Sequence, residues 1–238
     1  MNKILLLENL FFLKKKYLKY LSIILLCPMV MYAMNVLIFT SFYSHDSIQI
    51  WSSVGIWISC PVLCSYIYSH DIISNTKKAN FIFNSYLSFV NILISILLMS
   101  FFIALLSFLA SYFVIYGLVG TSVSFSHFFY LIITVFSIVS LFIPIGIFLG
   151  FYDNNNIGAA TVMLICCCVI QFSYFSNSDF AYKFNPIFDL IRNCSSFILN
   201  SSNYKFSFKP ILVMYSISTA FLFAVTYVLA KLINKKYE

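Results

Sequence analysis

Charged residues are scarce in this chain. Asp, Glu, Lys and Arg make up 9% of its 238 residues, whereas an ordinary soluble domain has about 25%. Hydrophobic residues make up 62% of the sequence. A soluble core of this size does not need so much apolar material, so the composition indicates a chain that lives in a membrane.

Glycine is also rare, with only six in the sequence. A phosphate-binding loop needs glycines that let backbone amides approach the phosphate, followed by Lys and Ser or Thr. No such string occurs. We therefore expect no ATP site, no bound cofactor and no catalytic residue in this chain.

Cysteine is present but poorly placed for disulfides or metal. Only Cys194 falls in an expected loop, and a free thiol within an apolar segment behaves as a small apolar group. The three histidines, His45, His70 and His127, fall on opposite sides of the expected membrane, so no metal site is expected. Cysteines within the apolar segments are Cys27, Cys60, Cys64, Cys166, Cys167 and Cys168.

Six long apolar runs dominate what is present. About 20 helical residues cross the roughly 30 Å hydrocarbon core of a bilayer, and the runs do not alternate in polarity as half-exposed strands do. The sequence predicts an all-α integral membrane protein forming one transmembrane domain over residues 1–238. The expected spans are 20–42, 49–69, 87–116, 127–150, 157–175 and 210–231.

The positions of the lysines predict the orientation, because Lys and Arg in short loops stay on the cytoplasmic side. Lysines precede the first span, lie between the second and third, and follow the sixth. Both termini are thus expected in the cytoplasm. The preference for Phe, Ile, Asn, Lys and Tyr over Gly and Ala is typical of an AT-rich bacterial genome, so the chain is expected to be multi-pass in a bacterial plasma (inner) membrane. The net charge of +7 indicates contact with anionic lipid headgroups rather than with nucleic acid.

Residues 1–19 are expected to form an interfacial helix. Leu6, Leu10 and Leu13 share one helical stripe, while the charged residues lie on another, as in helices that lie in the headgroup plane. The alternative is a cytoplasmic extension of the first span. The lysines expected to face the headgroups are Lys14, Lys15, Lys16 and Lys19.

Residues 70–86 are expected to form a cytoplasmic loop. Asp71 or Ser74 could cap a short amphipathic helix on which a partner docks. The alternative is a solvated turn that only fixes the topology. The residues expected to contact a partner are His70, Asp71, Ser74, Lys77 and Lys78.

Residues 176–209 are expected to form a long external connection. Its apolar pieces are too short to cross a bilayer but suit re-entrant or interfacial helices. Asn185 and Pro186 are expected to interrupt the chain between them. Asp189 and Arg192 are close enough in sequence to share one helical face.

Few polar residues fall inside the spans. Asn35, Asn91 and Gln171 are candidates for a substrate path, although such amides more often join helices to one another. None is ionisable, and this argues against a carrier coupled to protons or ions.

The order of these segments resembles the membrane subunits of ABC-2 type exporters over nearly the whole chain. The similar elements are the basic lead-in, "LLCPMVMYAMNVLIF" as first span, "GIWISCPVLCSYIYSHDIISNTKKANFIFNSY" leading into the cytoplasm, and "FNPIFDLIRNC" before the last span. The resemblance implies that the lead-in is a connecting helix, that 70–86 contains a coupling helix, and that the architecture is that of a type V exporter.

The same resemblance implies a function and partners. Such permeases dimerise with a second copy or a paralogue and pair with two separate ABC ATPase subunits, which bind ATP and Mg²⁺. The implied activity is export of an amphipathic or lipid-linked glycan, peptide or drug. A secondary transporter or channel-like subunit remains an alternative, as does an intramembrane enzyme.

Overall fold

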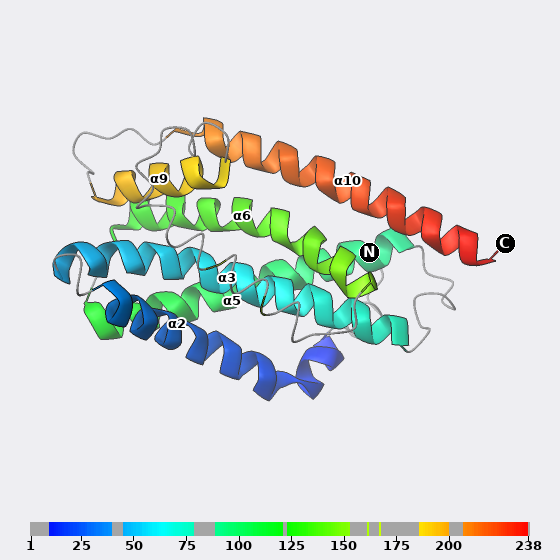
Figure 1. The fold of residues 1–238 in the computed structure, drawn as a ribbon, viewed down its shortest axis with the longest axis horizontal. Helices are drawn as coiled ribbons and strands as arrows, with labels where there is room; N and C mark the ends of the chain where they lie inside the picture. Colours follow the sequence, from blue (N-terminus) through cyan, green and yellow to red (C-terminus); the bar gives the residue numbers. More distant parts are fainter. Residues whose placement is uncertain are drawn as a thin grey trace.

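The computed structural model describes residues 10–39, 45–78, 89–120, 123–152, 161, 167, 186–199 and 207–237. These residues form long helices, and no strand occurs among them. The prediction of an all-helical chain is confirmed. Figure 1 shows the helices running roughly side by side along the long axis of the molecule.

Helix α3 (His45–Lys78) lies at the centre of the bundle, packed against α2, α5 and α6. Side chains from Ser52 to Tyr66 and from Tyr68 to Ser74 are buried, so α3 has almost no outward face over these turns. Seven residues in the helix are serines. Small side chains allow neighbouring helices to approach closely, which is how helices associate where the hydrophobic effect gives no driving force between them.

Helices α5 (Phe89–Val119) and α6 (Phe125–Tyr152) pack against α3. Helix α5 ends at Gly120, which has a φ of 72° and donates its backbone N–H to the carbonyl of Tyr116 at 2.8 Å. This is a left-handed helix cap, for which glycine has the lowest cost. At 31 residues, α5 is about 46 Å long, which exceeds the thickness of a bilayer core.

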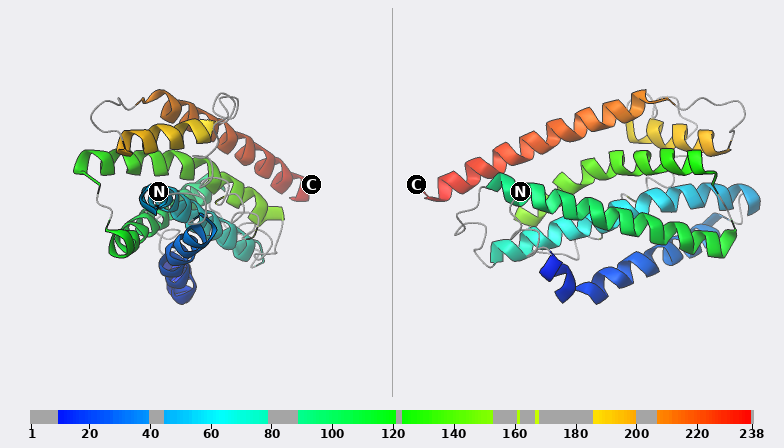
Figure 2. Two further views of the ribbon diagram at one scale, coloured as in Figure 1. Left: turned by 60° about the vertical axis from the view of Figure 1, so that its left-hand side comes forward. Right: turned by 180° about the vertical axis from the view of Figure 1, so that it is seen from behind.

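Helices α2 (Tyr17–Phe39) and α10 (Lys209–Tyr237) lie at the periphery, on opposite sides of the bundle (Figure 2). Many of their large apolar side chains point outward, including Leu37 at 80% and Phe223 at 75% exposure. Apolar surface of this extent is unusual on soluble monomers. Lipid tails are the solvent that suits it.

Four helices are long and apolar enough to cross a membrane, judged by length and composition. These helices support a multi-pass membrane protein, and they overlap the first, third, fourth and sixth predicted spans. The predicted span 49–69 lies within α3, which is not among the four, and 157–175 falls outside the described residues except at positions 161 and 167. The structure therefore supports four of the six predicted spans as membrane-crossing helices and does not confirm the other two. The four run from Tyr17 to Leu37, Asn91 to Val119, Phe125 to Tyr152, and Lys209 to Val228.

The chain changes direction just before α2. Residues 10–15 are helical, and a turn follows at Lys16, whose backbone N–H reaches the carbonyls of Phe12 and Leu13, both at 3.1 Å. Figure 1 shows this short blue segment at an angle to α2. The described part of the lead-in is thus not a straight extension of the first span, whereas residues 1–9 lie outside the description.

Helix α9 (Pro186–Leu199) lies within the segment predicted to be external or re-entrant. Leu190, Ile191 and Cys194 are buried against the bundle, while Asp189 and Arg192 are exposed. In the middle of α9 the Asn193 side chain donates to the carbonyl of Ser207 at 2.8 Å, which ties α9 to the start of α10. This helix is amphipathic and packed, as a short helix at a bundle surface must be.

Candidate functional site

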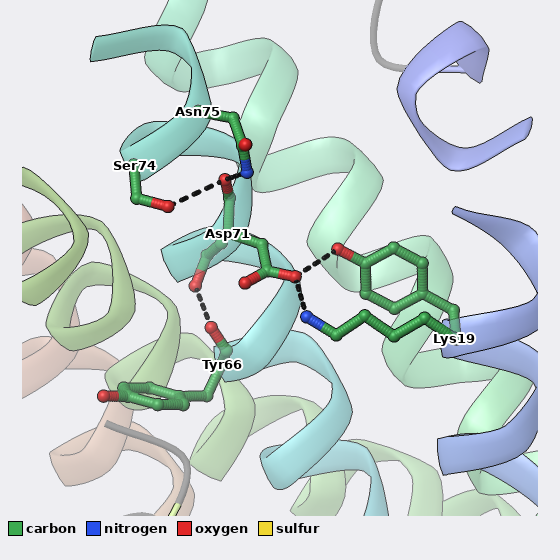
Figure 3. A network of polar contacts seen from close by, with 7 residues as sticks. Lys19, Tyr66, Asp71, Ser74 and Asn75 are labelled. Carbon is green, nitrogen blue, oxygen red and sulfur yellow. Dashed lines mark hydrogen bonds and ion pairs between the residues drawn. The ribbon is translucent and has the colours of Figure 1, made fainter. Parts of the chain in front are cut away.

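An ion pair joins α2 to α3 inside the bundle. Lys19, in the first turn of α2, pairs through its Nζ with Oδ2 of Asp71, which is 52 residues away in sequence. The Asp71 side chain is 1% exposed and the Lys19 side chain is 38% exposed. Because a buried carboxylate is costly unless paired, Lys19 is the group that makes the buried position of Asp71 tolerable (Figure 3).

A second donor reaches the same carboxylate oxygen. The phenol of Tyr20 donates to Oδ2 of Asp71 at 3.0 Å, so adjacent residues of α2 both hold one oxygen. The other oxygen, Oδ1, has no hydrogen-bond partner among the described residues. Hydrogen bonds to a charged group are stronger than those between neutral groups, so this contact ties the start of α2 to one position on α3.

Aromatic rings extend this connection to the lead-in. The ring of Tyr68 meets the ring of Tyr20 edge to face at 5.7 Å and that of Phe12 at 6.3 Å. Phe12 precedes the turn at Lys16, and the Lys16 ammonium lies 4.7 Å from the centre of the Phe12 ring. Three segments, the lead-in, α2 and α3, therefore meet at Tyr68. Aromatic pairs of this geometry contribute about 0.5–1.5 kcal/mol each beyond burial.

Two glycines of α6 face the other side of α3 at the same level. A Cβ at Gly150 would lie 2.6 Å from the carbonyl oxygen of His70, and one at Gly146 would lie 2.9 Å from that of Tyr66 and 2.1 Å from the Ser69 hydroxyl. The two backbones are thus in direct contact where glycine repeats at a spacing of four, as in other close helix pairs. Sequence analysis missed this contact, although the spacing Gly146-x-x-x-Gly150 was available as a signal.

The five residues predicted to contact a partner all lie in the last nine residues of α3. His70, Asp71 and Ser74 are each at most 2% exposed, and His70 stacks on Tyr66 at 6.2 Å. Asp71 and Ser74 were predicted as candidate helix caps, but α3 continues through both positions. The Ser74 hydroxyl instead bonds the carbonyl of Asp71 at 3.1 Å, and the Asn75 amide bonds the same carbonyl (Figure 3).

The rest of the predicted cytoplasmic loop is described only in part. Lys77 and Lys78 are the last two residues of α3, and 79–86 lie outside the described residues, as do the side chains of both lysines. Residues 70–78 are therefore an extension of a central helix rather than a loop. Asp71 joins this extension to α2.

The four lysines predicted to lie at the interface differ in their surroundings. Lys14 and Lys15 are exposed, Lys16 covers the ring of Phe12, and Lys19 pairs with Asp71. The structure thus brings together two residues, Lys19 and Asp71, that the sequence assigned to separate elements.

The remaining candidate residues lie apart from this site. Asn35 is buried at 2% exposure with no partner for its Nδ2 among the described residues, whereas Asn91 is partly exposed. Pro186 is the first residue of α9, which lies near the N-terminal end of α3 (Figure 1), whereas Asp71 lies near the C-terminal end of α3. Gln171 and Asn185 fall outside the described residues.

Among the residues that the structure describes, no group of three or more His, Cys, Asp or Glu side chains could hold a metal ion. No family model, no curated protein and no solved structure matches the chain. The interpretation of the site therefore rests on its own geometry.

Proposed function

We propose that this chain is the membrane subunit of a transporter driven by a separate ATPase, of the ABC-2 exporter type. The observation that carries the proposal is the Lys19–Asp71 pair, because it fastens the start of α2, directly after the basic lead-in, to the far end of the central helix. A subunit with no nucleotide site of its own needs a stiff element that receives motion at one end and moves membrane helices at the other.

Three contacts give that end of α3 the stiffness the proposal needs. The ion pair and the Tyr20 hydrogen bond hold it to α2, and the glycine contact at Gly150 holds it to α6. A displacement of α3 near Asp71 would then move α2 and α6 together. The lysines that end α3, Lys77 and Lys78, are the groups proposed to meet the ATPase.

The proposed substrate is amphipathic or lipid-linked and leaves the cell through the plasma membrane, with the permease acting as a dimer of two copies or with a paralogue. The four apolar helices and the outward apolar faces of α2 and α10 support a membrane location. Both termini are proposed to be cytoplasmic.

A secondary transporter is the second candidate, and one observation favours it. A carboxylate at 1% exposure inside the bundle is the kind of group that proton-coupled and ion-coupled carriers use. Asp71 was not counted among intramembrane groups from sequence, because it was expected in a loop.

The decisive experiment purifies the tagged chain from its native membranes and asks whether a protein with a phosphate-binding loop accompanies it. The expected complex hydrolyses ATP in proteoliposomes with sensitivity to vanadate. The charge-reversed double variant Lys19→Asp with Asp71→Lys should restore coupling that either single change removes, while Lys14→Gln, at an exposed lysine of the lead-in, should leave coupling intact.

Two results would contradict the proposal. If the chain purified alone moves a substrate uphill in vesicles with only a proton gradient, the secondary-transporter candidate is correct. If the complex forms but both single variants keep full coupling of ATP hydrolysis to transport, the ion pair is not the connection proposed here.

A further inference from the structure

Three sulfur atoms from two helices lie together between α2 and α3. The Sγ of Cys60 in α3 lies 3.7 Å from the Sγ of Cys27 and 3.7 Å from the Sδ of Met31, both in α2. Cys27 and Met31 are four residues apart, so they project from one face of α2 on successive turns. We call these three residues the sulfur cluster.

The sulfur cluster is mostly shielded from the surroundings. Cys60 is fully buried and Met31 is 6% exposed, while Cys27 is partly exposed. Both cysteines are free thiols. Cys27 is thus the most exposed member of the sulfur cluster, and Cys60 and Met31 lie deeper between the helices.

The spacing suits a metal bound by three sulfurs. With metal–sulfur bonds of about 2.3 Å, a trigonal site separates its sulfurs by about 4.0 Å, and the two separations from Cys60 are 3.7 Å. Cys60 can therefore share a metal ion with either neighbour after an adjustment of a few tenths of an ångström. Thiolate and thioether donors together are soft ligands, which favour Cu(I).

Zinc fits these residues less well. Structural zinc sites have four tetrahedral ligands, and the described residues contain no group of three or more His, Cys, Asp or Glu around which such a site could form. The two cysteines supply two donors, and the thioether of Met31 is the third. A low-coordinate soft ion is therefore the chemistry that matches.

We propose that Cys27, Cys60 and Met31 bind one Cu(I) ion between α2 and α3. On binding, both thiol protons leave to water as two Cu–S bonds form and the Met31 thioether adds a neutral donor, so Cu(I) with its two thiolates carries one net negative charge. Copper stays in the Cu(I) state and no residue is oxidised. The site is independent of the transport function proposed above.

The test uses the full chain, purified in detergent and kept reduced and anaerobic. Cu(I) is supplied in competition with a coloured Cu(I) chelator, and X-ray absorption identifies the scatterers around the retained metal. We expect one copper per chain with three sulfur neighbours. Cys27→Ser and Cys60→Ser should lower the affinity at least about 100-fold, the upper end of what loss of an outer-shell partner costs.

Matched variants separate the site from general thiol binding. Cys194→Ser removes another fully buried thiol and should leave the copper affinity unchanged. Met31→Leu conserves volume and should weaken binding at least about 10-fold without unfolding the protein, which keeps the test valid if a cysteine variant fails to fold. Equal retention in Met31→Leu and the parent would overturn the proposal.

Two further outcomes would also overturn it. One is failure of the reduced protein to take copper from the chelator. The other is isolation of the native protein with Cys27 and Cys60 joined in a disulfide, which would make the pair a covalent link rather than a metal site.

Discussion

The close contact between α6 and α3 can be tested by adding a single methyl group. In Gly150→Ala the new Cβ would lie 2.6 Å from the carbonyl oxygen of His70, about 0.8 Å inside the 3.4 Å at which ordinary contact begins. The obstacle is backbone, which cannot turn aside as a side chain can, so the two helices must separate. Overpacking of this kind costs about 1–3 kcal/mol, against a gain of up to about 1 kcal/mol from the higher helix propensity of alanine.

Gly117→Ala is the matched control. Gly117 also lies two residues before the end of a long helix, and a Cβ there meets nothing within 4 Å. The propensity gain is common to both variants, so Gly150→Ala should be less stable than Gly117→Ala by about 1–3 kcal/mol. Unfolding in graded mixtures of mild and denaturing detergent measures the difference. Equal stability of the two variants would refute the direct backbone contact.

Three other predictions concern the ion pair, a buried thiol and a buried amide. Lys19→Met leaves a carboxylate of 1% exposure without its cation and should destabilise the protein by about 3–5 kcal/mol. Asp71→Asn leaves only a lysine that can reach water and should cost less than half as much. Unfolding in detergent measures both losses of stability, and the reverse order would contradict this prediction. Burial raises the pKa of the Cys194 thiol to about 12, so the reactive thiolate is rare below that pH, and alkylation at pH 8 should be slow in the folded protein and fast after unfolding. Asn193→Ala removes the bond to the Ser207 carbonyl and should speed hydrogen exchange at the start of α10, with exchange in α5 unchanged as the internal control.

The sequence predicts the helices far better than it predicts how they pack. Apolar length alone locates α2, α5, α6 and α10, because a bilayer imposes a minimum run of residues. It does not distinguish a helix that faces lipid from one that faces other helices, since both are apolar. That is why α3, which the sequence treats as one span among six, is instead the central helix with buried serines on its surface.

The candidate site was predicted as separate parts. Lys19 and Asp71 were each singled out from sequence for different reasons, but the ion pair itself needs the three-dimensional arrangement of α2 and α3. Asp71 was expected in a cytoplasmic loop, as a helix cap or in a solvated turn, because a carboxylate and two lysines near a span end are typical of one. The continuation of α3 through Asp71 follows from tertiary contacts at Gly150 and Tyr20, and these override the local signal.

These contacts also indicate where the bundle can and cannot deform. Around Asp71, α3 is held on one face by charge and aromatic rings from α2 and on another by the backbone of α6, so relative motion there would expose a carboxylate or open a tight backbone contact. Helix α10 packs against α6 and α9, but its described contacts include neither an ion pair with another helix nor a backbone approach as close as that at Gly150. Any rearrangement that preserves the ion pair is therefore expected to move α10 against a unit formed by α2, α3 and α6. Cross-links between α10 and α6 should block such motion, whereas cross-links between α2 and α3 should leave it unchanged.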